Sequence, residues 1–163
     1  MTGSSDSRSR WHPLALVISL AAVAVVALLG GLASADAADE YARLAQPPWA
    51  PPSGLFGPAW GLLYLLMAIA VWLVWRRNPS WNSRAIQLYA VQLLVNLVWT
   101  PLFFALELRA VALGVIVLLD VLVIATIAAF SAVRRIAALL LVPYLGWILF
   151  ATALNYSIVM LNS

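Results

Sequence analysis

Long apolar runs separated by short polar segments organise the chain. The runs that we predict to be helical lie at residues 14–35, 55–75, 85–106, 110–133 and 136–160. Because a helix rises about 1.5 Å per residue, about 20 residues cross a hydrocarbon core of about 30 Å. Short connections between the later runs favour antiparallel neighbours. The pattern predicts an all-α integral membrane bundle of five transmembrane helices at residues 14–163, after a disordered cytoplasmic tail at residues 1–13.

The composition supports a domain embedded in lipid. Hydrophobic residues make up 65% of the 163 residues, charged residues make up 9%, and the mean hydropathy is +1.00. A soluble domain of this size could not bury so much apolar surface. The net charge of +3 comes from nine arginines, with no lysine, against six acids. We interpret the arginines as topology markers and expect no nucleic-acid partner, while the lysine-free composition suggests a GC-rich bacterial genome.

The first apolar run also has an interpretation as a secretory signal peptide. Arg8 and Arg10 precede it, and Ala33, Ser34 and Ala35 resemble a small-residue cleavage site. The uncharged run is 22 residues long, whereas the apolar region of a signal peptide usually has about 7–15 residues. Its length therefore favours a retained helix.

The distribution of arginines predicts how the chain crosses the membrane. Seven fall on one side of the predicted bundle, namely Arg8, Arg10, Arg76, Arg77, Arg84, Arg134 and Arg135. Arg43 and Arg109 fall on the other side. By the positive-inside rule, the N-terminus is cytoplasmic and the C-terminus emerges outside after five crossings. We therefore expect a multi-pass protein of the bacterial cell membrane, with the long connection near residues 36–53 facing outward.

Prolines and aromatic residues meet where that connection joins the second apolar run. The prolines at positions 47, 48, 51 and 52 disfavour a helix, so the chain should be extended or turning there. Trp49, Phe56, Trp60 and Tyr64 surround the junction, and the last two, four residues apart, share a helix face. They suit an aromatic wall below a stiff loop. They equally suit an interfacial belt, because Trp and Tyr collect at membrane interfaces.

Other polar and aromatic residues lie at similar predicted depths in later runs. Asn96 and Trp99 lie near one face of the third run, and Trp147 and Ala151 lie one helical turn apart in the fifth. With the predicted topology they approach Trp60, so that three helices would line a cavity below the proline-rich connection. Asn96 could instead supply an interhelical hydrogen bond worth about 1 kcal/mol or less.

Three further residues are unusual inside predicted spans. An acid near the middle of a bilayer costs about 2.5–3.5 kcal/mol, so Asp120 should face the interior of the bundle. We expect it to be protonated or hydrogen-bonded to a polar partner such as Asn96, and favour structural pairing over proton transport. Pro101 and Pro143 should interrupt the third and fifth helices.

The sequence offers little for metal binding or conventional catalysis. It contains no cysteine, and its sole histidine, His12, precedes the first run and is far from the aromatic residues. We find no paired carboxylates at hydrolase spacing, no Ser–His pair at one depth and no glycine-rich phosphate loop. We therefore expect no metal site and no obligatory cofactor.

Four segments resemble one family, the TspO or translocator protein family, also called the peripheral-type benzodiazepine receptor family. In chain order they are PPWAPPSGLFGPAWGLLY, NLVWTPLFF, VALGVIVLLD and VPYLGWILFATALNY. The resemblance implies a five-helix bundle, often a homodimer, that binds porphyrins such as haem and protoporphyrin IX. It also implies binding of hydrophobic drugs of the benzodiazepine type.

The resemblance further implies specific site residues. Those matching the family's ligand pocket are Tyr41, Trp49, Trp60, Tyr64, Asn96, Trp99, Trp147 and Ala151. Similarity to bacterial members that degrade porphyrins in light implies catalytic roles for Trp60 and Trp147 if this chain shares that activity. The family's cholesterol-recognition pattern has a basic residue soon after a tyrosine, whereas neither lysine nor arginine follows Tyr156. That pattern is therefore incomplete here, and the sequence leaves sterol binding open.

Three hypotheses for the function follow. The first is a membrane receptor or carrier for porphyrins and benzodiazepine-type molecules, with a cavity under the connection between the first two helices. The second is a light-dependent catalyst of porphyrin degradation. The third is a regulatory or scaffold protein that acts through partners. The expected partners are a flat hydrophobic small molecule, the lipid bilayer and a second copy of the chain.

Overall fold

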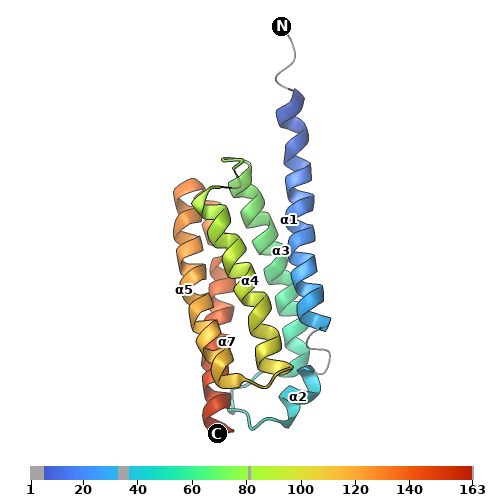
Figure 1. The fold of residues 1–163 in the computed structure, drawn as a ribbon, viewed down its shortest axis with the longest axis vertical. Coiled ribbons are helices and arrows are strands. Elements are labelled where there is room, and N and C mark those ends of the chain that lie inside the picture. The colour runs from blue at the N-terminus through green and yellow to red at the C-terminus, as the bar shows by residue number, and fades with distance from the viewer. Residues whose placement is uncertain (1–5, 33–36, 81, 163) are drawn as a thin grey trace.

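The fold is a bundle of long helices, shown in Figure 1. The computed structural model describes residues 6–32, 37–80 and 82–162. Its helices are α1 (Asp6–Leu32), α2 (Ala37–Arg43), η1 (Ser53–Leu55), α3 (Phe56–Trp75), α4 (Arg84–Phe104), α5 (Arg109–Val133), α6 (Arg135–Leu140) and α7 (Val142–Leu161). In these ranges five segments are long and apolar enough to cross a membrane: Leu14–Leu32, Ser53–Trp75, Arg84–Phe104, Arg109–Val133 and Arg135–Leu161. The predicted all-α membrane bundle is confirmed.

The helices form a ring whose order differs from their order along the chain. Helix α1 packs against α3 and α4, α4 packs against α5, and α5 packs against α6 and α7. Helices α6 and α7 then contact α3 and close the ring. Consecutive helices α3 and α4 contact each other less than either contacts α1. Residues of α1, α3, α4 and α7 can therefore face a common interior.

The core lies between α3, α5 and the last two helices. Met67, Leu119, Phe130, Tyr144 and Ile148 have no more than 1% of their surface exposed. Helix α1 packs far less closely, because within residues 14–32 only its valines at positions 23 and 26 are buried. Most of α1 therefore faces outward, where a bilayer can solvate its apolar side chains.

Proline divides the fifth predicted span into two helices. Helix α6 ends at Leu140, and α7 begins at Val142 with Pro143 in its first turn. Pro143 lacks an N–H and its ring clashes with the carbonyl four residues earlier, so a continuous helix is disfavoured there. By contrast, Pro101 lies inside α4 without ending it. The expected interruption is therefore a complete break in the fifth span, whereas α4 continues to Phe104.

The N-terminal segment differs from the predicted disordered tail. Helix α1 begins at Asp6, so residues 6–13 are helical. Extending an existing helix adds one hydrogen bond for each residue fixed, which favours growth beyond the apolar run. Residues 1–5 and the proposed cleavage site at residues 33–35 lie outside the described residues.

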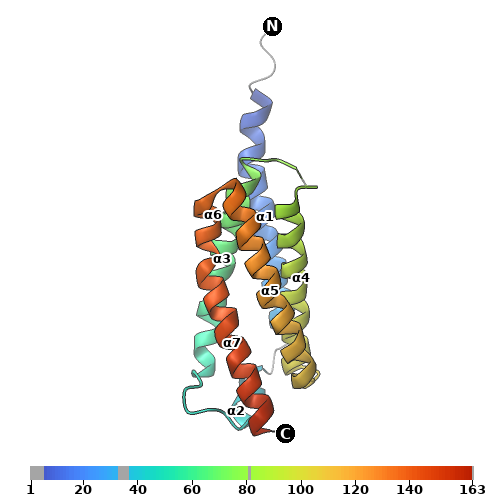
Figure 2. The ribbon, with the colours of Figure 1, turned by 90° about the vertical axis from the view of Figure 1, so that its left-hand side faces the viewer.

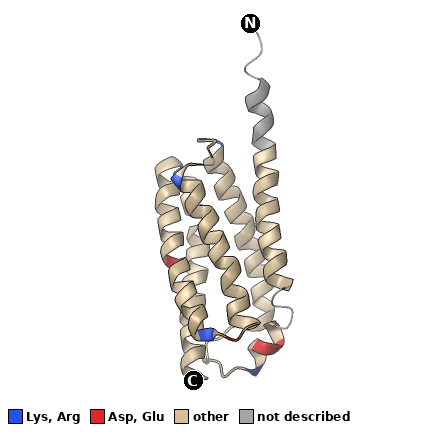
Figure 3. Cartoon of the chain, viewed as in Figure 1, with Lys and Arg blue, Asp and Glu red and all other residues tan. Residues whose placement is uncertain are grey.

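The two ends of the bundle differ in charge and in structure. Figure 2 shows α2, the connection after it and the C-terminal end of α7 at one end. Acidic residues gather on α2 at this end, as Figure 3 shows. Arg76, Arg77 and Arg84 lie at the other end, between α3 and the start of α4. We call the end with α2 and the connection after it the lid end, and the opposite end the arginine end.

Candidate ligand-binding cavity

A cavity of about 470 Å³ lies at the lid end of the bundle. Helices α1, α3, α4 and α7 line it, and α2 contributes Tyr41 from the connection above. Seven aromatic side chains line the cavity: Tyr41, Phe56, Trp60, Tyr64, Trp99, Phe104 and Trp147. Ala151, one turn after Trp147 on α7, widens it with a small side chain. The structure thus brings together six of the eight residues predicted for the ligand pocket. Phe56 also lines the cavity, although it was predicted only to surround the junction between the connection and the second run.

The aromatic rings contact one another edge to face and by stacking. Trp60 stacks on Tyr64 with ring centroids 5.4 Å apart and meets Trp147 at 6.5 Å and 83°. Phe56 meets Trp147 at 5.9 Å and 74°. Such offset and perpendicular pairs contribute about 0.5–1.5 kcal/mol beyond their burial. The rings therefore form a stiff wall that needs little rearrangement to receive a flat ligand.

Trp147, which lines the cavity, also has an unused hydrogen-bond donor. Its indole Nε1 is buried and has no partner among the described residues. A buried donor without a partner costs about 1–3 kcal/mol, which a ligand acceptor can recover. The N–H has less than 1 Å² of exposed surface, so a ligand acceptor could reach it only after a side-chain shift.

Glycines keep one wall of the cavity open. Gly30 and Gly31 of α1 and Gly57 and Gly61 of α3 line it. A Cβ atom at position 31, 57 or 61 would meet no heavy atom within 4 Å. Gly57 and Gly61 are exposed, so no side chain of these two residues fills this wall of the cavity. These glycines were not predicted to line the pocket, although Gly57 and Gly61 lie one helical turn apart.

The connection above the cavity, residues 37–55, is folded onto its own buried tyrosine. Tyr41 is 3% exposed, its hydroxyl donates to the Pro51 carbonyl at 3.1 Å, and its ring meets Phe56 edge-on. Gln46 Nε2 donates to the backbone carbonyl of Tyr41. Burial raises the pKa of the Tyr41 phenol, which keeps the hydroxyl protonated as a donor. We call residues 37–55 the lid.

Two contacts fasten the lid to the bundle. Arg109, at the start of α5, forms an ion pair with Glu40 of α2. Asn162, just after α7, exchanges two hydrogen bonds of 3.0 Å with the backbone of Ala45: it accepts from the N–H and donates to the carbonyl. Neither contact was foreseen, because the partners are 69 and 117 residues apart in sequence.

Asn96, predicted to contact ligand, lies outside the cavity lining and organises the side chains behind it. Tyr64 Oη donates to Asn96 Oδ1 at 3.0 Å, and Asn96 Nδ2 donates to Tyr144 Oη at 3.0 Å. Tyr144 Oη donates in turn to Gln92 Oε1 at 3.1 Å. This chain of hydrogen bonds joins α3, α4 and α7. This arrangement matches the alternative in which Asn96 supplies interhelical hydrogen bonds. It also orients Tyr64, which lines the cavity.

Two other residues lie apart from the cavity. Trp49, in the lid, is 48% exposed and meets Phe150 edge-on at 5.6 Å, so it lies outside the lining. Asp120 is 8% exposed and its Oδ2 accepts a hydrogen bond from Thr152 Oγ1 at 2.8 Å. Its predicted polar partner therefore exists, but is Thr152 rather than Asn96. Within the described ranges no three His, Cys, Asp or Glu side chains form a group that could hold a metal ion.

Loosening the lid is expected to leave the bundle intact. The Glu40–Arg109 pair joins side chains that are each 18% exposed, and such pairs contribute about 1 kcal/mol or less. Replacing Glu40 with glutamine should therefore speed hydrogen exchange of α2 amides by up to about fivefold, measured by mass spectrometry. Asp39→Asn removes an exposed neighbouring charge without breaking this pair. Equal exchange in both variants would contradict a fastening role for Glu40.

The comparisons with known proteins agree with this architecture. The model of the TspO/MBR family matches residues 17–161. The chain is 43% identical over 152 residues to the tryptophan-rich protein TspO of Archaeoglobus fulgidus, covering 92% of this chain and 98% of that protein. It is 39% identical over 143 residues to the tryptophan-rich sensory protein of Cereibacter sphaeroides, covering 88% of each. It is 39% identical over 121 residues to the human translocator protein, covering 72% of each. With its membrane-spanning helices, this multi-pass membrane protein belongs to the TspO/MBR family.

Proposed function

We propose that this protein is a membrane receptor or carrier for porphyrins, such as haem and protoporphyrin IX, and for flat hydrophobic molecules of the benzodiazepine type. The observation that carries the proposal is the cavity of about 470 Å³ with seven aromatic side chains in its lining. Its volume falls within the range of about 300–1,000 Å³ typical of small-molecule sites. Mainly apolar walls with few polar groups suit a flat conjugated ring system.

The lining assigns different tasks to different side chains. Trp60 and Trp147 offer indole faces and edges to a planar ligand. Thr100 and Ser53 add hydroxyl groups at the α4 and lid sides of the cavity. A ligand can enter from lipid past the glycines between α1 and α3, while the lid covers the end of the bundle. The ligand would thus stay out of water throughout.

A titration of the purified protein in lipid nanodiscs with protoporphyrin IX tests the proposal. Saturable quenching of tryptophan fluorescence in the dark, with full recovery of the porphyrin, is the expected result. Trp60→Phe combined with Trp147→Phe should weaken the affinity, whereas Trp49→Phe, outside the lining, should not. Absence of saturable binding would overturn the proposal and favour a scaffold that acts through partners.

Light-dependent porphyrin degradation is the second candidate, favoured by the contact of Trp60 with Trp147 at 6.5 Å in one cavity. An excited porphyrin against an indole can accept one electron from it and pass that electron to dioxygen, leaving an indole radical cation and superoxide. Illuminating the same nanodisc samples distinguishes the candidates. Loss of the porphyrin bands that requires light, oxygen and both tryptophans would support catalysis. Unchanged porphyrin bands under illumination would contradict catalysis and leave the receptor or carrier as the candidate function.

We further propose that the lid end faces outward, the arginine end faces the cytoplasm, and the protein works as a homodimer in the bacterial cell membrane. Arg76, Arg77 and Arg84 gather at the arginine end, as the positive-inside rule requires of a cytoplasmic face. The chain has no cysteine, so single cysteines can be introduced cleanly.

Cysteine labelling in intact cells tests this orientation. Cysteine replacing Ala42, exposed in the lid, should react with a membrane-impermeant maleimide. Cysteine replacing Asn82, exposed between α3 and α4, should react only after the cells are opened. The reverse pattern would invert the proposed topology. Cross-linking of the same samples reports whether two copies associate.

A further inference from the structure

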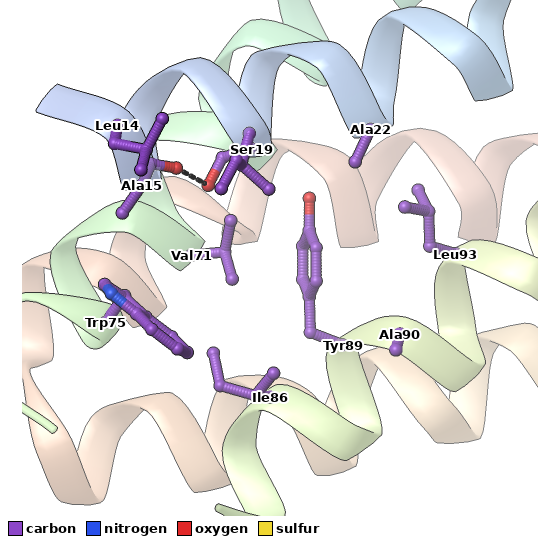
Figure 4. A pocket seen from close by; sticks show the side chains of 11 residues that line it. Leu14, Ala15, Ser19, Ala22, Val71, Trp75, Ile86, Tyr89, Ala90 and Leu93 are labelled. Atoms are coloured by element: carbon purple, nitrogen blue, oxygen red, sulfur yellow. Dashed lines mark hydrogen bonds between the residues drawn. The ribbon is translucent and has the colours of Figure 1, made fainter. Parts of the chain in front are cut away.

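A second cavity, of about 240 Å³, lies at the arginine end of the bundle between α1, α3 and α4. Figure 4 shows its side chains, among them Ala22 of α1, Val71 of α3, and Ile86 and Leu93 of α4. Ile18 of α1 also lines it. No residue that lines it also lines the aromatic cavity. Ile18 and Ala22 are exposed, so the second cavity is bordered by surface that faces the bilayer.

One polar atom in this apolar cavity has no partner. Tyr89 is 6% exposed and its ring stacks on Phe130 with centroids 6.0 Å apart, which fixes the direction of the side chain. Figure 4 shows the ring projecting from α4 toward α1, with its hydroxyl between Ser19 and Ala22. That hydroxyl has no hydrogen-bond partner among the described residues, and Ser19 Oγ already donates to the Ala15 carbonyl. Leaving a buried hydroxyl unpaired is destabilising, so an acceptor brought by a ligand would be stabilising.

The depth of Tyr89 indicates which acceptor could reach it. Tyr89 is five residues after Arg84, or about 7.5 Å along the helix at about 1.5 Å per residue. The polar region of a bilayer is about 5–7 Å thick on each side of the hydrocarbon core. With Arg84 at the headgroups, the Tyr89 hydroxyl therefore lies near the boundary where ester carbonyls of glycerolipids join their acyl chains.

The charge beside the cavity and the size of the cavity restrict the class of ligand further. Exposed Arg76, Arg77 and Arg84 place positive charge beside the cavity at headgroup level, which favours an anionic phosphate. The cavity is smaller than the range of about 300–1,000 Å³ typical of sites for drug-sized ring systems. A single hydrocarbon chain fits its narrow, apolar lining better than a porphyrin.

We propose that this second cavity binds one acyl chain of an anionic glycerophospholipid, whose ester carbonyl accepts a hydrogen bond from Tyr89. The phosphate of the lipid then lies among Arg76, Arg77 and Arg84. The hydroxyl has less than 1 Å² of exposed surface, so α1 must shift outward slightly as the carbonyl arrives. Little packing opposes that shift, because Val23 and Val26 are the only buried side chains of α1 within residues 14–32.

Native mass spectrometry of the full chain, delipidated in detergent and titrated with defined lipids, tests the proposal. Ester-linked phosphatidylglycerol should bind the wild type more tightly than phosphatidylcholine does. Tyr89→Phe removes only the hydroxyl and should weaken phosphatidylglycerol binding about fivefold, as expected for one hydrogen bond of about 1 kcal/mol. Tyr156→Phe is the matched control, because Tyr156 is 54% exposed on α7.

An ether-linked phosphatidylglycerol, which lacks the ester carbonyl, isolates the proposed bond. It should bind the wild type about fivefold more weakly than the ester lipid, and Tyr89→Phe should weaken it no further. Equal binding of ester and ether lipids by the wild type, or equal effects of the two tyrosine substitutions, would overturn the proposal. Porphyrin titration of the same variants reports independently on the aromatic cavity, so failure of one site is distinguishable from failure of the other.

Discussion

Replacing Ala151 with leucine is expected to weaken porphyrin binding at least about tenfold. Ala151 is 7% exposed on α7 and lines the aromatic cavity one turn beyond Trp147. A leucine there would occupy space that the proposed ligand needs, and overpacking typically costs about 1–3 kcal/mol. A loss of about 1.4 kcal/mol is tenfold in affinity, which tryptophan quenching in nanodiscs can measure.

Ala153→Leu provides a matched control for this prediction. Ala153 is two residues later on the same helix and is exposed, so leucine there would extend into lipid. Its porphyrin affinity should equal that of the wild type, and both variants should keep the wild-type melting temperature within a few degrees. Tight binding by Ala151→Leu would mean that the ligand lies elsewhere. Equal weakening by both substitutions would point to a general effect on α7.

Replacing Asn96 with leucine should destabilise the bundle by about 2 kcal/mol. Asn96 is 1% exposed, accepts from Tyr64 and donates to Tyr144, so the substitution leaves the Tyr64 hydroxyl without its acceptor. For a chain of this size, such a loss lowers the melting temperature by about 4–8 °C. Thermal unfolding in detergent or nanodiscs measures the shift.

A double-mutant cycle with Tyr64→Phe separates positioning from ligand contact. If Asn96 acts through Tyr64, then Asn96→Leu should reduce porphyrin affinity in the wild type but have no further effect in Tyr64→Phe. Part of the lost stability should also return in the double variant, because the unpaired hydroxyl is gone. Additive losses of affinity would instead support direct contact of Asn96 with the ligand.

The number of spans was readable from the sequence, while their arrangement was not. Apolar length alone identifies a transmembrane helix, since every backbone polar group must be satisfied within it. Pro143 predicted the break between α6 and α7, because a proline disrupts a helix through its own ring and missing N–H. The placement of α1 between α3 and α4 depends on side-chain packing across the bundle, which no local pattern encodes.

The candidate site shows the same division. Trp60 and Tyr64 were predictable as neighbours because four residues make one helical turn. The place of Asn96 behind Tyr64, rather than in the lining, depends on the rotation of α4 relative to α3 and α7. Likewise, Asp120 of α5 accepts a hydrogen bond from Thr152 of α7. The apolar pattern of the sequence does not show which faces of these two helices meet. Depth in the membrane can be estimated from sequence, whereas the rotation of each helix requires the structure.

The sparse packing of α1 makes the membrane itself a component of both cavities. This helix contributes Ala27, Gly30 and Gly31 to one cavity and Ile18 and Ala22 to the other, yet buries only two side chains within residues 14–32. A helix that buries so few side chains can adjust its tilt to the thickness of the surrounding hydrocarbon. We therefore expect the ligand affinities of both cavities to differ between thin and thick membranes.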